Sequence, residues 1–115
     1  MNGIILRGIA GALFGLAAVS AGETAFAQQR TTIPLILKDH RFEPTEPRAP
    51  AGQPLTIVLK NLDPTPAEFE SKTLRVEKVV AGGGQVTVNI RPLAAGRYRF
   101  FDDFHEEAQG FLVVE

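Results

Sequence analysis

Apolar residues recur at every second position in short runs along this chain. The runs are TIPLILK (32–38), LTIVLKN (55–61), VTVNI (86–90), RYRFF (97–101) and the more continuous GFLVVE (110–115). Successive side chains of a β-strand point to opposite faces, so a repeat of two residues predicts strands that each bury one face. In the second run, for example, Leu55, Ile57 and Leu59 are expected to face the core. The pattern therefore indicates a fold built of β-strands.

Proline and glycine separate the runs, in the segments EPTEPRAPAG, DPTP, AGGG and PLAAG. Such segments are typical of turns and loops. Pro34 lies inside the first run, and because proline cannot donate a ladder hydrogen bond, that run is expected at a sheet edge. About seven short strands with this spacing are typical of a small sandwich or barrel. Without a helix to cover a face, two sheets must pack together, so we predict an all-β, Greek-key β-sandwich.

The first 27 residues differ from the rest of the chain. A short start with one basic residue, Arg7, precedes an apolar stretch from Gly8 to Ala21, and small residues follow up to Ala27. This order predicts a secretory signal peptide over residues 1–27, with a retained membrane anchor as the alternative. The stretch is too short for a secure transmembrane helix. We expect residues 28–115 to form one domain, soluble and periplasmic, with no membrane span after cleavage.

Charge and cysteine content exclude several classes of function. The chain has 12 Lys and Arg against 13 Asp and Glu, a formal net charge of −1, and no cysteine. A balanced charge argues against nucleic acid or an anionic membrane as partner. Without cysteine there is no disulfide framework, so the core alone must hold the domain. The chain also offers no set of residues for nucleophilic hydrolysis, which makes hydrolytic enzymes poor candidates.

The segment FFDDFHEEAQGF (100–111) gathers most of the side chains that could do chemistry. Four carboxylates and one imidazole fall within residues 102–107, in a chain with two histidines. Carboxylates with imidazole are ligands for iron, manganese or Cu(II) rather than Cu(I). A hydrophilic surface loop with a stray histidine is the alternative interpretation. We expect these residues to lie on a loop outside the core.

Two further places carry candidate ligands. Glu68 and Glu70 are two residues apart on a predicted strand, so both should point to one face. An acidic pair of this kind is ordinary on a solvated strand and does not by itself make a site. His40 is interpreted as a surface polar residue. The alternative is that it approaches the end of the fold where the candidate metal ligands lie.

The order of these segments resembles that of cupredoxins over residues 32–115. The resemblance is carried by FEPTEPRAPAGQPLTIVLKNLDPTPAEFE followed by LAAGRYRFFDDFHEEAQGFLVV. At the copper ligands the sequence departs from the family: Ala67 follows Pro66 where a histidine is expected, and Asp102 replaces the cysteine. His105 is retained, but residues 106–109 contain no methionine. Without a thiolate the chain is not predicted to be a blue-copper electron carrier.

The pattern EFE…FFDDFHEEAQG further resembles the EfeO/FtrB-type cupredoxin-like proteins of bacterial periplasmic iron uptake. Fused EfeO-type domains carry cysteine where this chain has Phe42 and Asp102, so their copper site is not carried over. The resemblance implies an iron permease and a periplasmic iron-binding protein as partners. It also implies that the strand end at Glu68 converges with the DDFHEE loop at one pole. The predicted metal ligands are Glu68, Asp102 and His105, supported by Glu70 and Glu106, with Asp103 and Glu107 as outer contacts.

Two functions follow from these residues. One is a metal-handling protein that assists iron uptake by iron binding, handover or ferrous oxidation, with Cu(II) as the alternative metal. Whether it is an enzyme stays open, because no sequence feature shows a route for an electron, and binding or transfer is the first expectation. The other is a metal-free β-sandwich adaptor whose acidic pole docks a permease or an iron-binding partner.

Overall fold

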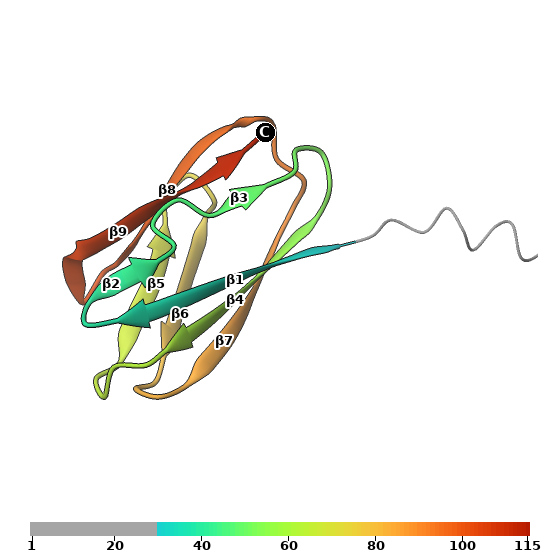
Figure 1. Ribbon diagram of the computed structural model, residues 1–115. Helices are drawn as coiled ribbons and strands as arrows, with labels where there is room; N and C mark the ends of the chain where they lie inside the picture. Colours follow the sequence, from blue (N-terminus) through green and yellow to red (C-terminus); the bar gives the residue numbers. More distant parts are fainter. Residues whose placement is uncertain (1–29) are drawn as a thin grey trace, which may run out of the picture.

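The computed structural model describes residues 30–115, which form a sandwich of two β-sheets (Figure 1). The predicted signal peptide, residues 1–27, lies outside the described residues. Between residues 30 and 115 there is no helix long and apolar enough to cross a membrane.

Nine strands run through the described part of the chain. They are β1 (Thr31–Lys38), β2 (Arg41–Glu43), β3 (Arg48–Ala49), β4 (Leu55–Asn61), β5 (Ala67–Ser71), β6 (Val76–Val80), β7 (Gln85–Ile90), β8 (Gly96–Asp102) and β9 (His105–Val114). The prediction of an all-β sandwich is confirmed. The strand number exceeds the expected seven because the proline-rich segment 41–49 contributes two short strands, β2 and β3.

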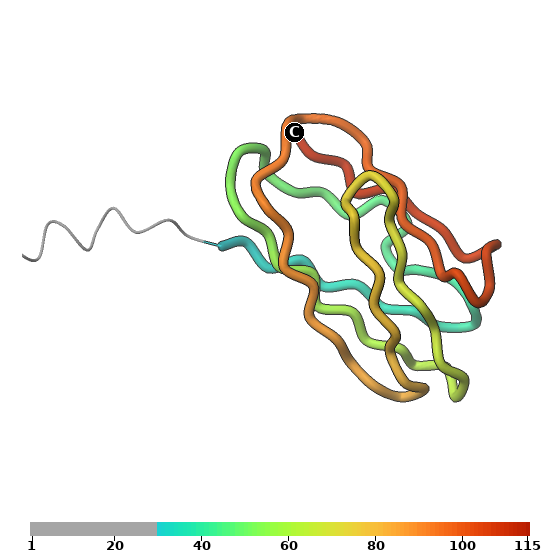
Figure 2. Tube along the Cα trace, turned by 180° about the vertical axis from the view of Figure 1, so that it is seen from behind, coloured from blue at the N-terminus to red at the C-terminus, as the bar shows by residue number. Residues whose placement is uncertain are grey.

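The two sheets have the orders β2-β1-β4-β7 and β3-β9-β8-β5-β6. Most neighbours are antiparallel, but β1 pairs with β4 in parallel and β3 pairs with β9 in parallel. The Cα trace shows the hairpins β5–β6 and β8–β9 side by side in one layer (Figure 2). The chain reversals that follow β1, β4 and β8 lie at one end of the sandwich (Figure 1).

The expectation that β1 is an edge strand because of Pro34 is wrong for the strand as a whole. β1 lies between β2 and β4. However, β2 pairs only with Ile36–Lys38, whereas Pro34 pairs with Val58 of β4 alone. The missing backbone donor thus falls on the half of β1 that has a partner on one side only, where proline is tolerated.

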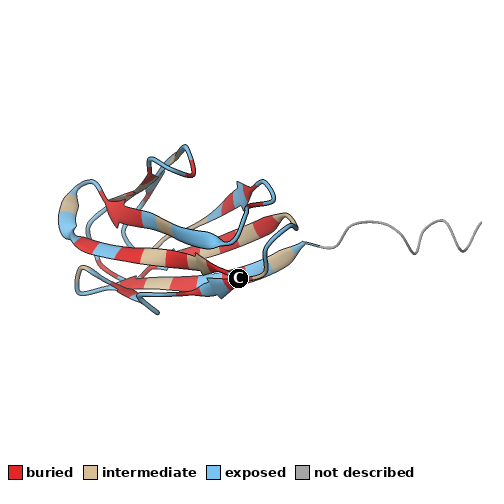
Figure 3. Cartoon of the chain, turned by 90° about the horizontal axis from the view of Figure 1, so that it is seen from above, coloured by how far each residue is buried: buried red, intermediate tan, exposed pale blue. Residues whose placement is uncertain are grey.

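The core lies between the two layers (Figure 3). Leu55, Ile57 and Leu59 of β4 are completely buried, which confirms the alternation expected from the sequence. Because neither sheet is covered by a helix in the described residues, each sheet buries its inner face against the other. The outer faces carry the polar residues of the alternating pattern.

Three phenylalanines form the part of the core nearest the end where the chain reversals gather. The Phe42 ring meets Phe100 edge-on at 5.0 Å and Phe69 at 6.2 Å, and Phe69 lies 5.4 Å from Phe100. All three rings are buried, and edge-on and tilted arrangements of this kind are the ones that aromatic pairs prefer. Phe42 follows His40 by two residues, and Phe100 precedes Asp102 by two. The cluster therefore anchors the segments that carry the candidate ligands.

Candidate metal centre

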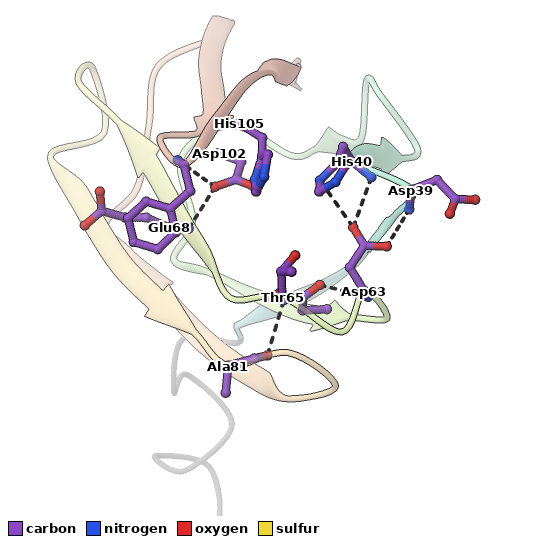
Figure 4. A network of polar contacts seen from close by, with 10 residues as sticks. Asp39, His40, Asp63, Thr65, Glu68, Ala81, Asp102 and His105 are labelled. Carbon is purple, nitrogen blue, oxygen red and sulfur yellow. Dashed lines mark hydrogen bonds and ion pairs between the residues drawn. The ribbon is translucent and has the colours of Figure 1, made fainter.

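Three segments that are distant in sequence meet at one end of the sandwich (Figure 4). The β1–β2 turn carries Asp39 and His40, the β4–β5 loop carries Asp63, and the β8–β9 hairpin carries Asp102 and His105. Of these five residues, only Asp102 and His105 belonged to the predicted site. We refer to this end of the molecule as the histidine pole.

The β1–β2 turn presents His40 in an unusual backbone conformation. Asp39 and His40 have φ angles of 53° and 57°, in the left-handed region. Non-glycine residues rarely adopt this region, although Asp and His do so more often than most. The Asp63 carboxylate accepts hydrogen bonds from both backbone N–H groups of the turn, at 2.6 Å from Asp39 and 3.0 Å from His40.

The two imidazole rings of the described residues stack on each other. The centroids of His40 and His105 are 4.0 Å apart, with an interplanar angle of 28°. His40 Nδ1 is buried and makes no hydrogen bond, and its distance to the Asp63 carboxylate, 3.7 Å, is too long for one. A buried nitrogen without a partner is costly. In the neutral ring with the proton on Nε2, this nitrogen has a free lone pair, which can bind a metal ion.

Asp102 ends β8 with its side chain completely buried. The expectation that residues 102–107 form a loop outside the core is wrong for most of them, because Asp102 ends β8, residues 105–107 begin β9, and the turn itself is residues 103–104. Asp102 pairs with the buried Phe69 of β5 and shares its inward direction. Its Oδ1 accepts N–H groups from Glu68 at 2.9 Å and Phe104 at 3.0 Å. Its Oδ2 faces His105 Nδ1 at 3.3 Å. The carboxylate thus has one oxygen committed to the backbone and one directed at the imidazole.

His40, Asp102 and His105 form a set of donor atoms suitable for a metal. Each offers a ligand atom, and these atoms lie within 4.8 Å of one another. Two imidazoles with one carboxylate are a known ligand set for non-haem Fe(II), and imidazole also binds zinc and Cu(II). The unbonded His40 nitrogen and the mixed donor set fit such an ion. A thiolate-based copper site is excluded, since the chain has no cysteine.

A second group of carboxylates lies on the outer side of the sheet. Glu68, Glu70 and Asp103 place one oxygen each within 4.8 Å of one another. Phe69 points into the core and is completely buried, so its neighbours Glu68 and Glu70 point outward. The Glu68 carboxylate is directed away from the two rings (Figure 4). We call this group the acidic cluster.

The acidic cluster is electrostatically strained. The pKa of Glu68 is raised by partial burial, by a hydrogen bond with the Asp103 carboxyl group and by the charges of Glu77, Asp103 and Glu70. The pKa of Glu70 is raised by partial burial and by the charges of Asp103, Glu77 and Glu106, although Lys72 opposes the shift. Carboxylates that crowd one another favour protonation or a cation.

The predicted ligand set is therefore divided between two places. Asp102 and His105 lie together, with His40 as a third member, whereas Glu68 and Glu70 lie with Asp103. Glu106 and Glu107 are exposed at the start of β9 and belong to neither group. The backbone of Glu68 is linked to the β8–β9 hairpin, because its N–H donates to Asp102 and its carbonyl accepts from the Asp103 N–H at 2.9 Å.

Sequence reasoning gave His40 a place at the pole only as the alternative and did not include Asp63. A signal for His40 was present, because Asp-His directly after an apolar run is a pair that tolerates a left-handed turn. Asp63 lies two residues after Asn61 in a proline-rich loop, where aspartate and asparagine often bond to a backbone. That its partner would be the β1–β2 turn depends on the parallel pairing of β1 with β4.

Comparison with known proteins identifies a family and a relative of this chain. The sequence matches the family described as cupredoxin-like domain over residues 9–114. An uncharacterized protein of Rickettsia prowazekii (strain Madrid E) is 36% identical over 83 residues, which span 71% of this chain and 66% of that protein.

Two copper proteins have similar structures. Auracyanin A, a "blue" copper protein from Chloroflexus aurantiacus, has a TM-score of 0.63 and 20% identity, over 76% of this chain and 100% of that chain. The metal binding domain of the Streptococcus pneumoniae D39 Cu(I)-exporting P-type ATPase CopA has a TM-score of 0.65 and 12% identity, over 76% and 97% of the chains. At these identities the likeness shows a shared fold.

Proposed function

This chain belongs to the cupredoxin-like domain family, and from that membership we propose that it binds a metal ion at the histidine pole. The ligands we assign are His40, Asp102 and His105. We further propose that the metal is iron and that the protein serves periplasmic iron uptake by binding iron and handing it over. The partners in this proposal are an iron permease and a periplasmic iron-binding protein.

One observation carries the proposal: two imidazoles and one buried carboxylate offer ligand atoms within 4.8 Å of one another. This combination leaves coordination positions open and suits Fe(II). The copper proteins of similar fold support metal binding at large, since one is a blue copper protein and the other was solved with Cu(I). The absence of cysteine from the chain favours a harder metal than Cu(I) here.

The three assigned ligands would have different roles in metal binding. His40 and His105 would bind as neutral imidazoles, and Asp102 would supply negative charge that balances the cation. The phenylalanine cluster packs beside the two segments that carry these ligands and would shield one side of the ion from water. Iron is the cargo in this proposal. A carboxylate ligand favours Fe(III) over Fe(II) and would therefore promote ferrous oxidation. That reaction would also require an external acceptor to take the electron. Binding and handover therefore come first.

A second candidate function is favoured by the acidic cluster. Glu68, Glu70 and Asp103 lie on the outer face, and Phe104, 49% exposed, follows Asp103 directly. Complementary charge across an interface steers association, so such an acidic surface would favour a basic partner. In this alternative the protein is a metal-free adaptor for a permease or an iron-binding protein.

Calorimetric titration of the purified protein with Fe(II) under anaerobic conditions tests the proposal, with Fe(III) and Cu(II) as parallel probes. We expect one Fe(II) per chain. His105→Ala should weaken binding by about tenfold or more, whereas the matched exposed change Glu107→Gln should leave it unaltered. If the protein binds none of the three ions, the adaptor function replaces the metal-binding one.

A further inference from the structure

We propose that Asp63 is a positioning residue that holds His40 in the metal-binding arrangement through the backbone of the β1–β2 turn. The inference rests on the proposed function, because it concerns the same site. It assigns a role to a residue outside the ligand set, in a loop separated from His40 by the whole of β4.

The Asp63 carboxylate is fitted to the turn. Its side chain is 9% exposed, and each oxygen accepts one backbone N–H: Oδ1 from Asp39 at 2.6 Å and Oδ2 from His40 at 3.0 Å. Burial acts to raise the pKa of Asp63, but the hydrogen bonds from the backbone N–H groups of His40 and Asp39 act against it, and the pKa is lowered. The ionised carboxylate is therefore the form that bonds to the turn.

The turn needs such a partner. Two consecutive non-glycine residues, Asp39 and His40, have positive φ angles, a conformation that side chains disfavour. Strain of this kind persists where surrounding structure fixes it, and it is often found at functional sites. An amide at position 63 could not replace the carboxylate, because its NH₂ group would face one of the two N–H donors.

Asp63 is itself held from behind. Its backbone N–H donates to Asn61 Oδ1 at 3.0 Å, and its carbonyl accepts from Gly83 at 3.0 Å. Asn61 Nδ2 in turn donates to the carbonyls of Thr65 at 2.8 Å and Ala81 at 3.2 Å (Figure 4). The β6–β7 loop thus supports the β4–β5 loop, which supports the turn.

The outcome of this support is the placement of the His40 ring. It stacks on His105 with centroids 4.0 Å apart, and its Nδ1 stays free of hydrogen bonds. Asp63 Oδ2 is 3.7 Å from that nitrogen and is already bonded to the turn. Asp63 therefore acts on the site through His40, and its own oxygens stay directed at the backbone.

The test combines Asp63→Asn with His40→Ala. In the wild-type background, Asp63→Asn should weaken Fe(II) binding by about tenfold, the lower end of the effect of residues that orient metal ligands. In the His40→Ala background, the same change should have no further effect, because residues that act through one another are not additive. Equal weakening in both backgrounds would mean that Asp63 acts independently of His40 and would overturn the inference.

A second readout requires no metal. Hydrogen exchange of the Asp39 and His40 amides should become faster in Asp63→Asn, since both lose a charged acceptor. Unchanged exchange at both amides would also overturn the inference. If the wild-type protein itself binds no Fe(II), the proposed function fails, and this result is distinguishable because it appears before any variant is made.

Ser71→Ala serves as the matched control. Ser71 is buried and holds another turn, donating to the Arg99 carbonyl at 2.6 Å and accepting from Leu74 N–H at 3.3 Å. It lies at the far end of β5 from the histidine pole. Its removal should destabilise the fold but leave Fe(II) affinity unchanged. If Ser71→Ala weakens binding as much as Asp63→Asn, the effect is general loosening and the inference is wrong.

Discussion

The histidine pole and the acidic cluster both gather ionisable side chains near the β8–β9 hairpin, but they are built differently. In the pole, Asp63 and Asp102 are buried and bonded to backbone N–H groups. In the cluster, Glu68 and Glu70 are half-buried, and burial and neighbouring carboxylates raise their pKa values. One group is fixed by the fold, and the other is a local excess of charge.

This difference separates a site from a surface. A carboxylate that accepts backbone N–H groups has one orientation, so its remaining oxygen can face a defined partner, as Asp102 Oδ2 faces His105. Carboxylates that only meet one another can rotate toward solvent or share a proton. In the function that we propose, the metal therefore binds at the pole, and the cluster attracts cations or basic partners.

The largest difference in the free energy of unfolding is expected between variants of two adjacent aspartates. Asp102→Asn removes a buried charged acceptor of two N–H groups, which should lower the free energy of unfolding by about 1–3 kcal/mol. Asp103→Asn removes an exposed charge and should change it by less than about 0.5 kcal/mol. Urea unfolding of the metal-free variants measures both. Equal losses would show that Asp102 is no more fixed than its neighbour.

The next contrast concerns metal-induced stability. Saturation with Fe(II) at a hundredfold excess over the dissociation constant should stabilise the wild-type protein by about 2.7 kcal/mol. His40→Ala should lose most of this gain, because it removes one of two imidazoles, whereas Glu70→Gln should keep it. Thermal unfolding with and without Fe(II) gives the comparison. A full gain in His40→Ala would remove that residue from the ligand set.

Copper loading provides a spectroscopic form of the same comparison. A Cu(II) ion held by imidazole and carboxylate has no sulfur ligand, so the protein should be pale, without the intense absorption of thiolate-bound copper. Electron paramagnetic resonance should show nitrogen coupling that His105→Ala reduces. Coupling from oxygen ligands alone would instead indicate the acidic cluster.

The smallest effect on stability is expected from a substitution in the acidic cluster itself. Because the pKa of Glu68 is raised in the folded protein, its ionised form opposes folding, and this cost appears as the pH rises through the folded-state pKa. Glu68→Gln should therefore slightly raise the thermal midpoint near neutral pH. The gain should vanish in acid, where the wild-type carboxyl is protonated. A gain that persists unchanged in acid would have another cause.

The sequence was sufficient for the fold because each strand carries its own alternation, as Leu55, Ile57 and Leu59 illustrate. It was sufficient to predict that Asp102 and His105 lie close together, because they are neighbours in one hairpin. That they bind a metal stays a prediction. The sequence was not sufficient for His40, whose position depends on a left-handed turn and on the distant Asp63. Nor could it separate Glu68 from the pole, since only the direction of the side chain, set by the burial of Phe69, distinguishes the two groups.

The central claim is that metal binds at the histidine pole and not at the acidic cluster. Calorimetric titration with Fe(II) tests it directly on two variants, His40→Ala/His105→Ala and Glu68→Gln/Glu70→Gln/Asp103→Asn. We predict that the first variant loses measurable binding, while the second binds one Fe(II) per chain with nearly wild-type affinity. Retained binding in the first variant together with its loss in the second would contradict the claim.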